Sequence, residues 1–320
     1  MADGRYAQVM DLSTVPVTDQ RYRRTSLKTF TLDESDAIAG CFHEHGYAVV
    51  KNVFNAVEVA ALKCAADRAK QRGLKVGRAF RHGNLGYWIK DDPRIGTNVI
   101  GMQWPSYDEA ILESSRRDPR MLTLLEPLIG RNIRQIVNQL HWKTPGSTFA
   151  VSFHRDRINR RPAEAFRALA TSYVQTASVI DPMTAENGAL LLVPGSHLRK
   201  PRSKHPGTGN FVAGNVSRAY LADEGFCDAD LLSIYAEPGD VALWHVDTIH
   251  GSEMNQSSED RCLYINGYVD ARNCMRGHWA FIEGQGIPLP PIDVPVLVHR
   301  DDIFDQIEVE FAPPPTRPMD

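Results

Sequence analysis

The chain has 320 residues, of which 42% are hydrophobic and 23% are charged, and its formal net charge at pH 7 is −3. This composition excludes a disordered or fibrous chain, and the slightly acidic balance disfavours nucleic acid and anionic membranes as partners, because both favour basic surfaces. The five cysteines are odd in number and form no C-x-x-C pair, so neither a disulfide framework nor a zinc knuckle is indicated.

We expect one domain built from consecutive parts of different character. These parts are an irregular arm over residues 1–30, a mainly helical part over 31–131, a β-rich core over 132–280, and a Pro-rich extension over 281–320. The division rests on where helical periodicity gives way to short β-prone runs.

Residues typical of helix ends and loops divide the mainly helical part into separate helices and a loop. Gly46 is placed to end a first helix, and Asn55 is placed to cap a second. Asp118 followed by Pro119 is typical of another helix start. Residues 73–104 carry Gly, Asn, Asp and Pro with aromatic residues between them, a pattern that predicts a surface loop.

Short β-prone runs separated by turn residues fill the region after residue 132. The runs are Ile133–Trp142, Thr148–Phe153, Thr171–Ile180, Ala189–Val193, Leu232–Tyr235, Val241–Trp244 and Cys262–Val269. Many short strands at such spacing predict a mainly β fold with flanking helices, in which the core is a double-stranded β-helix of the jelly-roll or cupin type. Residues 199–230 are long for a connection, so we expect an insertion or lid there.

Three residues of this core form a candidate metal site. His154 and Asp156 lie two positions apart at a predicted strand, so their side chains can project to the same face. His250, after a later strand, adds a second imidazole. Two histidines and one carboxylate are the facial ligand set of non-haem iron(II) oxygenases. The set leaves three positions open, which suits chelation by 2-oxoglutarate and access for dioxygen.

A candidate co-substrate clamp follows the second histidine. Arg261 comes eleven positions after His250 (261 − 250), at the start of a predicted strand. Its planar guanidinium could bind the distal carboxylate of 2-oxoglutarate with two hydrogen bonds. Ser252 could add a hydroxyl.

These residues resemble the phytanoyl-CoA dioxygenase family of iron- and 2-oxoglutarate-dependent oxygenases. Further matching stretches are His45-Gly-Tyr-Ala-Val-Val50, Glu186 to His197, and Pro238-Gly-Asp240. The resemblance covers roughly residues 30–280. It implies that His154, Asp156 and His250 bind iron and that Arg261 and Ser252 clamp the co-substrate, with Gln139 as a further co-substrate contact.

Substrate contacts are less sharply indicated. The cluster of Arg155, Arg157, Arg160 and Arg161 is typical of a solvated face, and its alternative role is recognition of an anionic substrate. Arg81 and Trp88 are candidates because N-terminal loops often close the active sites of the family.

Three other residues could compete for roles at the metal. His197 and His245 are expected to be hydrogen-bonded core histidines rather than ligands. Asp247 is a weaker carboxylate ligand candidate than Asp156, which has the paired H-x-D spacing. On the strand before the metal site, His141, Trp142 and Lys143 cannot all face one cavity, because neighbouring side chains alternate.

The resemblance implies a dioxygenase that hydroxylates an unactivated C–H bond of a small molecule and releases succinate and carbon dioxide. A carboxylate ligand at Asp156 argues against a halogenase, and desaturation or ring closure stay open beside hydroxylation. Open alternatives are a non-catalytic jelly-roll protein that binds or senses a ligand, and another metal-dependent barrel enzyme.

The sequence lacks a signal peptide and a membrane-length apolar run, so we expect a cytoplasmic protein. The Pro-rich tail could pack on a second copy, which leaves a homo-oligomer open.

Overall fold

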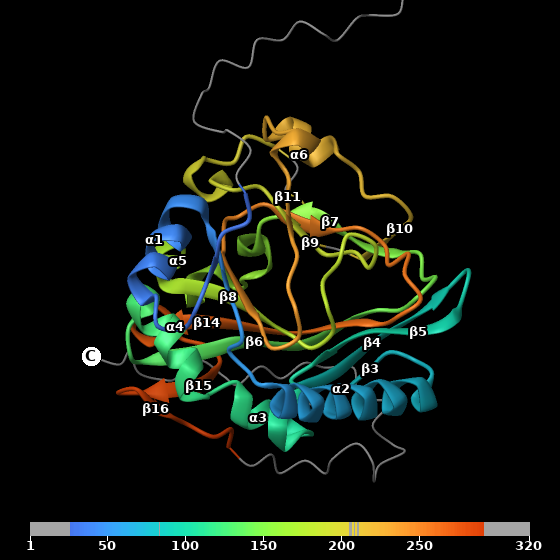
Figure 1. The fold of residues 1–320 in the computed structure, drawn as a ribbon, viewed down its shortest axis with the longest axis horizontal. Coiled ribbons are helices and arrows are strands. Elements are labelled where there is room, and N and C mark those ends of the chain that lie inside the picture. The colour runs from blue at the N-terminus through green and yellow to red at the C-terminus, as the bar shows by residue number, and fades with distance from the viewer. Residues whose placement is uncertain (1–25, 83, 205–206, 208, 210, 291–320) are drawn as a thin grey trace, which may run out of the picture.

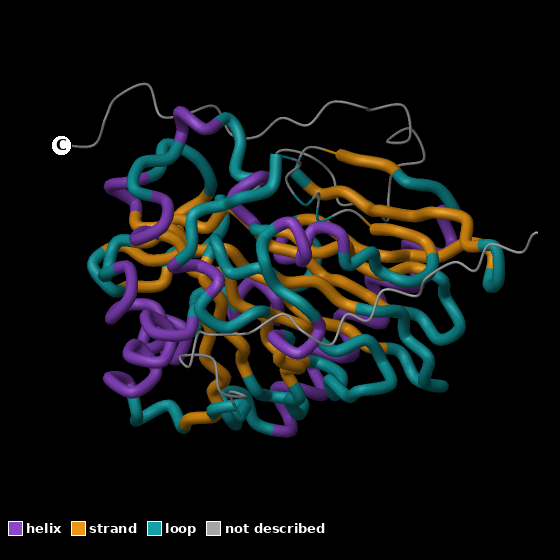
Figure 2. The backbone as a smooth tube through the Cα atoms, turned by 90° about the horizontal axis from the view of Figure 1, so that it is seen from above, coloured by secondary structure: helices purple, strands orange, loops and turns teal. Residues whose placement is uncertain are grey.

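The structure is a computed structural model that describes residues 26–82, 84–204, 207, 209 and 211–290. Two β-sheets lie face to face, and helices pack outside the larger one (Figures 1 and 2). The expected double-sheet core with flanking helices is therefore confirmed. Most of the predicted arm and most of the Pro-rich extension lie outside the described residues.

The larger sheet carries the strands that form the floor of the site. Among the described residues it has eleven strands, nine along one path and two off it. Along that path they are β1 (Thr29–Phe30), β2 (Tyr47–Val50), β12 (Val241–His245), β8 (Tyr173–Val179), β14 (Arg261–Asp270), β6 (Ile133–Lys143), β5 (Gly96–Gln103), β4 (Leu85–Asp92) and β3 (Phe80–His82). β15 (His278–Ile282) pairs with β6 and with β16 (Gln285–Gly286).

The smaller sheet lies opposite. It contains, in order, β10 (Phe211–Ala213), β7 (Phe149–His154), β13 (His250–Ser252), β9 (Leu190–Leu192) and β11 (Leu232–Ile234). The strand pairs of this sheet are antiparallel, and the register sets His250 opposite His154. Two candidate ligands are therefore neighbours across one strand pair.

The helices are α1 (Ser35–His45), α2 (Ala56–Val76), α3 (Ala110–Ser115), α4 (Pro119–Ile129), α5 (Leu169–Ser172) and α6 (Ala219–Asp223). Gly46 ends α1 with a φ of 77°, a conformation that glycine adopts without steric cost. The Asn55 side chain accepts from the backbone N–H groups of Val57 and Glu58, which completes the capping box of α2. Asp118 caps α4 through Arg120 N–H.

Alternation along the strands separates two apolar layers. On β12, Leu243 packs toward the helices, whereas Trp244 packs between the two sheets. On β14, Tyr264 and Leu263 divide in the same way. In Figure 1, α2 and α3 lie below the larger sheet and α6 lies above the smaller one. The space between the sheets is where inward side chains can form a cavity.

The surface loop predicted over residues 73–104 is wrong. α2 extends to Val76, and most of the remaining stretch forms β3, β4 and β5, which extend the larger sheet beyond β6. Gly101 lies on β5 where an added Cβ would come within 2.4 Å of Trp88 Cε3. The glycine that weakens the strand signal is thus required for the packing of Trp88.

The predicted insertion over residues 199–230 covers the outer face of the smaller sheet. Its strand β10 pairs with β7, and its residues Leu221 and Phe226 pack with Phe153 of β7. The insertion is therefore anchored to the strand that carries His154. Among the described residues, no helix combines the length and apolar character needed to cross a membrane.

Candidate metal centre and co-substrate cavity

The three predicted ligands converge. His154 is the last residue of β7, Asp156 starts the 3-10 turn η2 (Asp156–Asn159), and His250 starts β13. His154 Nε2 lies 3.8 Å from Asp156 Oδ1, and His250 Nε2 lies 3.7 Å from Asp156 Oδ2. All three side chains are buried, and their ligand atoms lie within 4.8 Å of one another, so they could hold one metal ion.

Backbone carbonyls orient both imidazoles. His154 Nδ1 lies 3.0 Å from Ser152 O, and His250 Nδ1 lies 2.9 Å from Thr248 O. An Nδ1–H that donates to a carbonyl leaves the Nε2 lone pair for a metal. Burial, with a smaller effect of the neighbouring His154, lowers the pKa of His250 to about 4. His250 is therefore neutral at pH 7, as a metal ligand must be.

Two further side chains hold the Asp156 carboxylate. Trp244 Nε1 donates to Oδ2 at 3.0 Å, and Arg160 Nη2 lies 3.1 Å from Oδ1. Burial alone would raise the pKa of Asp156, but the charge of Arg160 and the two histidines lower it well below its usual value. The carboxylate is therefore ionised and aimed at the centre. Its contact with Trp244 was not predicted from the sequence.

A cavity of about 780 Å³ opens beside these ligands. Side chains from both sheets line it, including Gln139 and His141 of β6, Arg261 of β14 and Ser252 of β13. The cavity volume lies in the range of small-molecule sites. The co-substrate residues predicted from the sequence thus share one cavity with the predicted metal ligands.

Arg261 is a buried cation. The residue is 4% exposed, and its Nε has no hydrogen-bond partner among the described residues. No carboxylate forms an ion pair with it among the residues described. Burial lowers the pKa of Arg261 to about 10. A buried charge of this kind is costly unless a partner binds, and an anion at this end of the cavity would offset that cost.

Neutral polar groups lie near this cation. His141 Nε2 lies 3.0 Å from Gln139 Oε1. Burial and, secondarily, Arg261 lower the pKa of His141 to about 3, so His141 is neutral. Lys143, opposite Arg261 in the strand register, instead directs Nζ to the carbonyls of Ser252 and Glu253. Trp142 packs toward the helices, as alternation requires.

The predicted substrate arginines do not act as one cluster. Arg155 is buried. Its guanidinium donates to the backbone carbonyls of Ser196 and Asp247 and to the carboxylate of Glu224. Arg157 is exposed and pairs with Asp247. Neither lines the cavity, so neither is retained as a substrate contact. Arg160 lines the cavity beside Asp156, while Arg161 lines an adjoining pocket.

Arg81 and Trp88 also differ in placement. Arg81 Nη2 donates to Gln103 Oε1, and Arg81 is not among the residues that line the cavity. Trp88 lines it, with its ring edge-on to His141 at 5.5 Å between centroids and 6.1 Å from Phe211 of the insertion.

The competing histidines and aspartate lie apart from the metal ligands. The rings of His197 and His245 lie 4.8 Å apart between centroids, tilted by 50°, and each is hydrogen-bonded to a backbone carbonyl. Asp247 is occupied by Arg157. The preference for Asp156 and His250 over these residues agrees with the only group of candidate metal ligands found among the described residues.

Comparison with known proteins supports the same assignment. The family model described as phytanoyl-CoA dioxygenase (PhyH) matches residues 42–262. A probable alpha-ketoglutarate-dependent hypophosphite dioxygenase of Stutzerimonas stutzeri is 26% identical over 230 residues, which are 71% of this chain and 76% of that protein. The 1-deoxypentalenic acid 11-beta-hydroxylase of Streptomyces arenae is 26% identical over 233 residues, or 71% and 77%.

Two other matches are more limited. Dioxygenase lolE1 of Epichloe uncinata is 28% identical over 147 residues, which are 46% of this chain and half the length of that protein (50%). The solved epimerase SnoN in complex with Fe3+, alpha ketoglutarate and nogalamycin RO is 19% identical, with a TM-score of 0.54 over 82% of this chain and 98% of that one. This structural likeness concerns the fold alone. Because the family model spans most of the chain, the protein belongs to the phytanoyl-CoA dioxygenase (PhyH) family of iron- and 2-oxoglutarate-dependent dioxygenases.

Proposed function

We propose that this dioxygenase hydroxylates an unactivated C–H bond of a small anionic molecule. In this proposal His154, Asp156 and His250 hold iron(II). Arg261 and Ser252 bind the distal carboxylate of 2-oxoglutarate, and Gln139 contacts the co-substrate. Two neutral imidazoles and one carboxylate suit iron(II), because they leave three positions for co-substrate and dioxygen.

The single observation that carries the proposal is the buried guanidinium of Arg261, which no described carboxylate pairs with and which lines the same cavity as the metal ligands. A dicarboxylate could bind the metal at one end and neutralise Arg261 at the other. The two-pronged guanidinium fits a carboxylate better than a point charge would. A metal-dependent hydrolase would have no use for this cation.

When bound, iron and 2-oxoglutarate supply a dioxygen-derived oxidant, with release of succinate and carbon dioxide. The chain contributes orientation and shielding. Trp244 and Arg160 keep Asp156 ionised and directed at the metal. The carboxylate occupies the position that a halogenase would leave open, so hydroxylation is favoured. The neighbouring rings of Trp88 and Phe211 supply an apolar wall on one side of the cavity.

An anionic substrate is supported by the relatives and by the cavity. Hypophosphite is an anion and 1-deoxypentalenic acid is ionised at neutral pH, so the molecules named in two relatives are both negatively charged. In this chain Arg160 lines the cavity at the metal ligands. The two relatives thus share a negatively charged substrate although the molecules differ otherwise, and a positively charged cavity wall would bind either one.

The test is a screen of small carboxylic and phosphonic acids with the iron-loaded protein, 2-oxoglutarate and 18O2, measuring succinate and product mass. We expect succinate in proportion to a product that gains one labelled oxygen, and no product from Asp156→Ala. A product that loses two hydrogens without gaining oxygen would contradict hydroxylation.

A further inference from the structure

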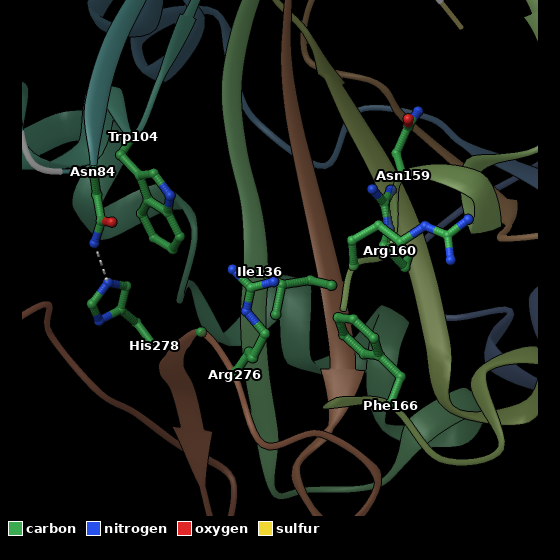
Figure 3. Close-up of a pocket in the computed structure, with 10 residues that line it drawn as sticks. Asn84, Trp104, Ile136, Asn159, Arg160, Phe166, Arg276 and His278 are labelled. Carbon is green, nitrogen blue, oxygen red and sulfur yellow. Dashed lines mark hydrogen bonds between the residues drawn. The ribbon is translucent and has the colours of Figure 1, made fainter. Parts of the chain in front are cut away.

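A smaller pocket of about 180 Å³ adjoins the main cavity. The two share three wall residues, Ile136, Asn159 and Arg160. Figure 3 shows Asn84, Trp104 and His278 on one side of this pocket and Asn159, Arg160 and Phe166 on the other, with Arg276 between them. We call it the side pocket. Its shared wall means that one molecule could extend from it toward the metal ligands.

The side pocket is cationic. Arginines 160, 161 and 276 line it, and no Asp or Glu does. The charge of Arg160 is compensated by Asp156, although its Nε is buried without a hydrogen-bond partner. Arg161 Nε donates to Ile158 O at 3.2 Å, and no ion pair holds its guanidinium among the described residues. The pocket wall therefore carries guanidinium groups and no carboxylate, and Arg161 is the arginine on it that no described carboxylate pairs with.

The opposite wall is aromatic and fixed in place. Trp104 is 6% exposed and meets His278 edge-on, with ring centroids 4.7 Å apart. Asn84 Nδ2 and Tyr107 Oη lie 3.1 and 3.0 Å from His278 Nε2. A rigid wall loses little conformational entropy when a ligand binds. Since one water occupies roughly 30 Å³, the space admits a carboxylate or phosphate with a few attached carbons.

We propose that the side pocket binds the anionic head group, a carboxylate or a phosphate, of the substrate. Arg161 and Arg276 hold the anion, and the carbon skeleton passes Ile136 and Asn159 into the main cavity. Arg160 stands between the pocket and Asp156, so the head group is kept from competing for the metal. This inference rests on the proposed function and names where its substrate acid is recognised.

The test uses phenyl phosphate and benzoate as probes, with neutral benzamide as the uncharged comparison. Iron- and 2-oxoglutarate-loaded protein is titrated anaerobically by calorimetry, so that Arg261 is already occupied. The variants are Arg161→Gln/Arg276→Gln, Arg161→Lys and, as a matched control, Arg157→Gln, which removes a nearby arginine that lies outside both pockets.

We expect at least one anionic probe to bind, benzamide to bind at least tenfold more weakly, and the double glutamine variant to lose at least tenfold in affinity. Arg161→Lys should retain part of the affinity, and Arg157→Gln should match wild type. A phosphate preference would identify a phosphorylated substrate, and a benzoate preference a carboxylic acid.

Equal binding by wild type and the double variant, or no anion binding by wild type, would overturn the inference. The visible band of the iron–2-oxoglutarate chelate is recorded in parallel, and its absence from wild type would count against the proposed function instead.

Discussion

Asp156 depends on two donors that the H-x-D motif does not contain. Trp244 reaches it from β12 and Arg160 from the end of η2. A buried tryptophan usually finds an acceptor for its ring N–H, so a Trp on the strand before His250 was a usable signal that the sequence analysis missed. Groups of this kind commonly tune metal affinity.

We predict that Trp244→Phe weakens iron(II) binding about 10- to 100-fold, because the carboxylate loses the donor that orients it. Trp142→Phe is the matched control, since the buried Nε1 of Trp142 has no hydrogen-bond partner in the part of the chain that the structure describes. Anaerobic iron titration measures both. Equal affinities for the two variants would show that the Trp244 contact does not matter for the metal.

The buried charge of Arg261 is expected to lower the stability of the co-substrate-free protein and to strengthen 2-oxoglutarate binding. We expect Arg261→Met to stabilise the co-substrate-free protein by about 1–3 kcal/mol, because an unpaired buried charge is removed. The same change should weaken 2-oxoglutarate binding at least about 30-fold, as when one partner of a buried charge pair is lost. Urea unfolding and co-substrate titration give the two numbers. Destabilisation with unchanged affinity would mean that Arg261 has a purely structural role.

The four neighbouring arginines show where sequence reasoning reaches its limit. Strand alternation is enough to bring His154 and Asp156 to one face, which is why the triad was predictable. Arg155 is still extended, with φ −110° and ψ 135°, so the alternation carries on to Asp156; from Asp156 the chain forms η2, and alternation no longer fixes the direction of the later side chains. Only the folded structure separates Arg160, which lies at the metal ligands, from Arg155 and Arg157, which do not line the cavity.

At the scale of elements, the strands of the core were predictable because their apolar runs are bounded by turn residues. The extension β3 to β5 was not, since Gly96, Asn98 and Gly101 lower the strand propensity of β5. Two of these residues have structural reasons to be there. Asn98 Nδ2 donates to Ser147 Oγ at 2.9 Å, and Gly101 makes room for Trp88. Tertiary packing therefore overrides local preference in this hairpin.

The insertion is tied to the metal strand by a buried ion pair. Arg155 Nη2 lies 2.9 Å from Glu224 Oε2, and the side chains are 3% and 1% exposed. Glu224 Oε1 also accepts from the backbone N–H groups of Arg202 and Ser203. Arg155 stands between the two ligands His154 and Asp156, so the order of the insertion and the geometry of the site are coupled.

We predict that Glu224→Ala destabilises the protein by about 3–5 kcal/mol, because it leaves a buried guanidinium without its counterion. Asp228→Ala is the matched control in the same insertion, since Asp228 pairs with Arg218 at the surface. That change should cost less than about 1 kcal/mol. Urea unfolding compares them, and similar small losses would contradict the coupling.

At the scale of the whole molecule, buried histidines make stability sensitive to mild acid. Burial is the main cause that lowers the pKa of His141 to about 3 and of His197 and His278 to about 4. The unfolded chain binds protons at these groups below about pH 6.5, whereas the folded protein does not. Their contribution to stability is therefore complete above pH 6.5 and falls as the pH drops toward 4.

We expect the metal-free protein to lose stability between pH 7 and pH 5, by about 2 kcal/mol from His141 alone. His197→Gln should show a smaller loss than wild type. The measurement is the urea unfolding midpoint with a chelator present. This window lies above the usual range of carboxyl groups, so a flat profile from pH 7 to pH 5 would refute the assignment of neutral buried histidines.

The central claim is that His154, Asp156 and His250 form the iron centre to which 2-oxoglutarate binds. The most direct measurement is an anaerobic titration of the purified protein with iron(II) and 2-oxoglutarate, following the weak visible charge-transfer band of the chelate. We predict the band in wild type and in His197→Gln, which changes a histidine outside the centre, and its loss in His154→Ala. A folded wild-type protein without the band, or a His154→Ala variant that keeps it, would contradict the account.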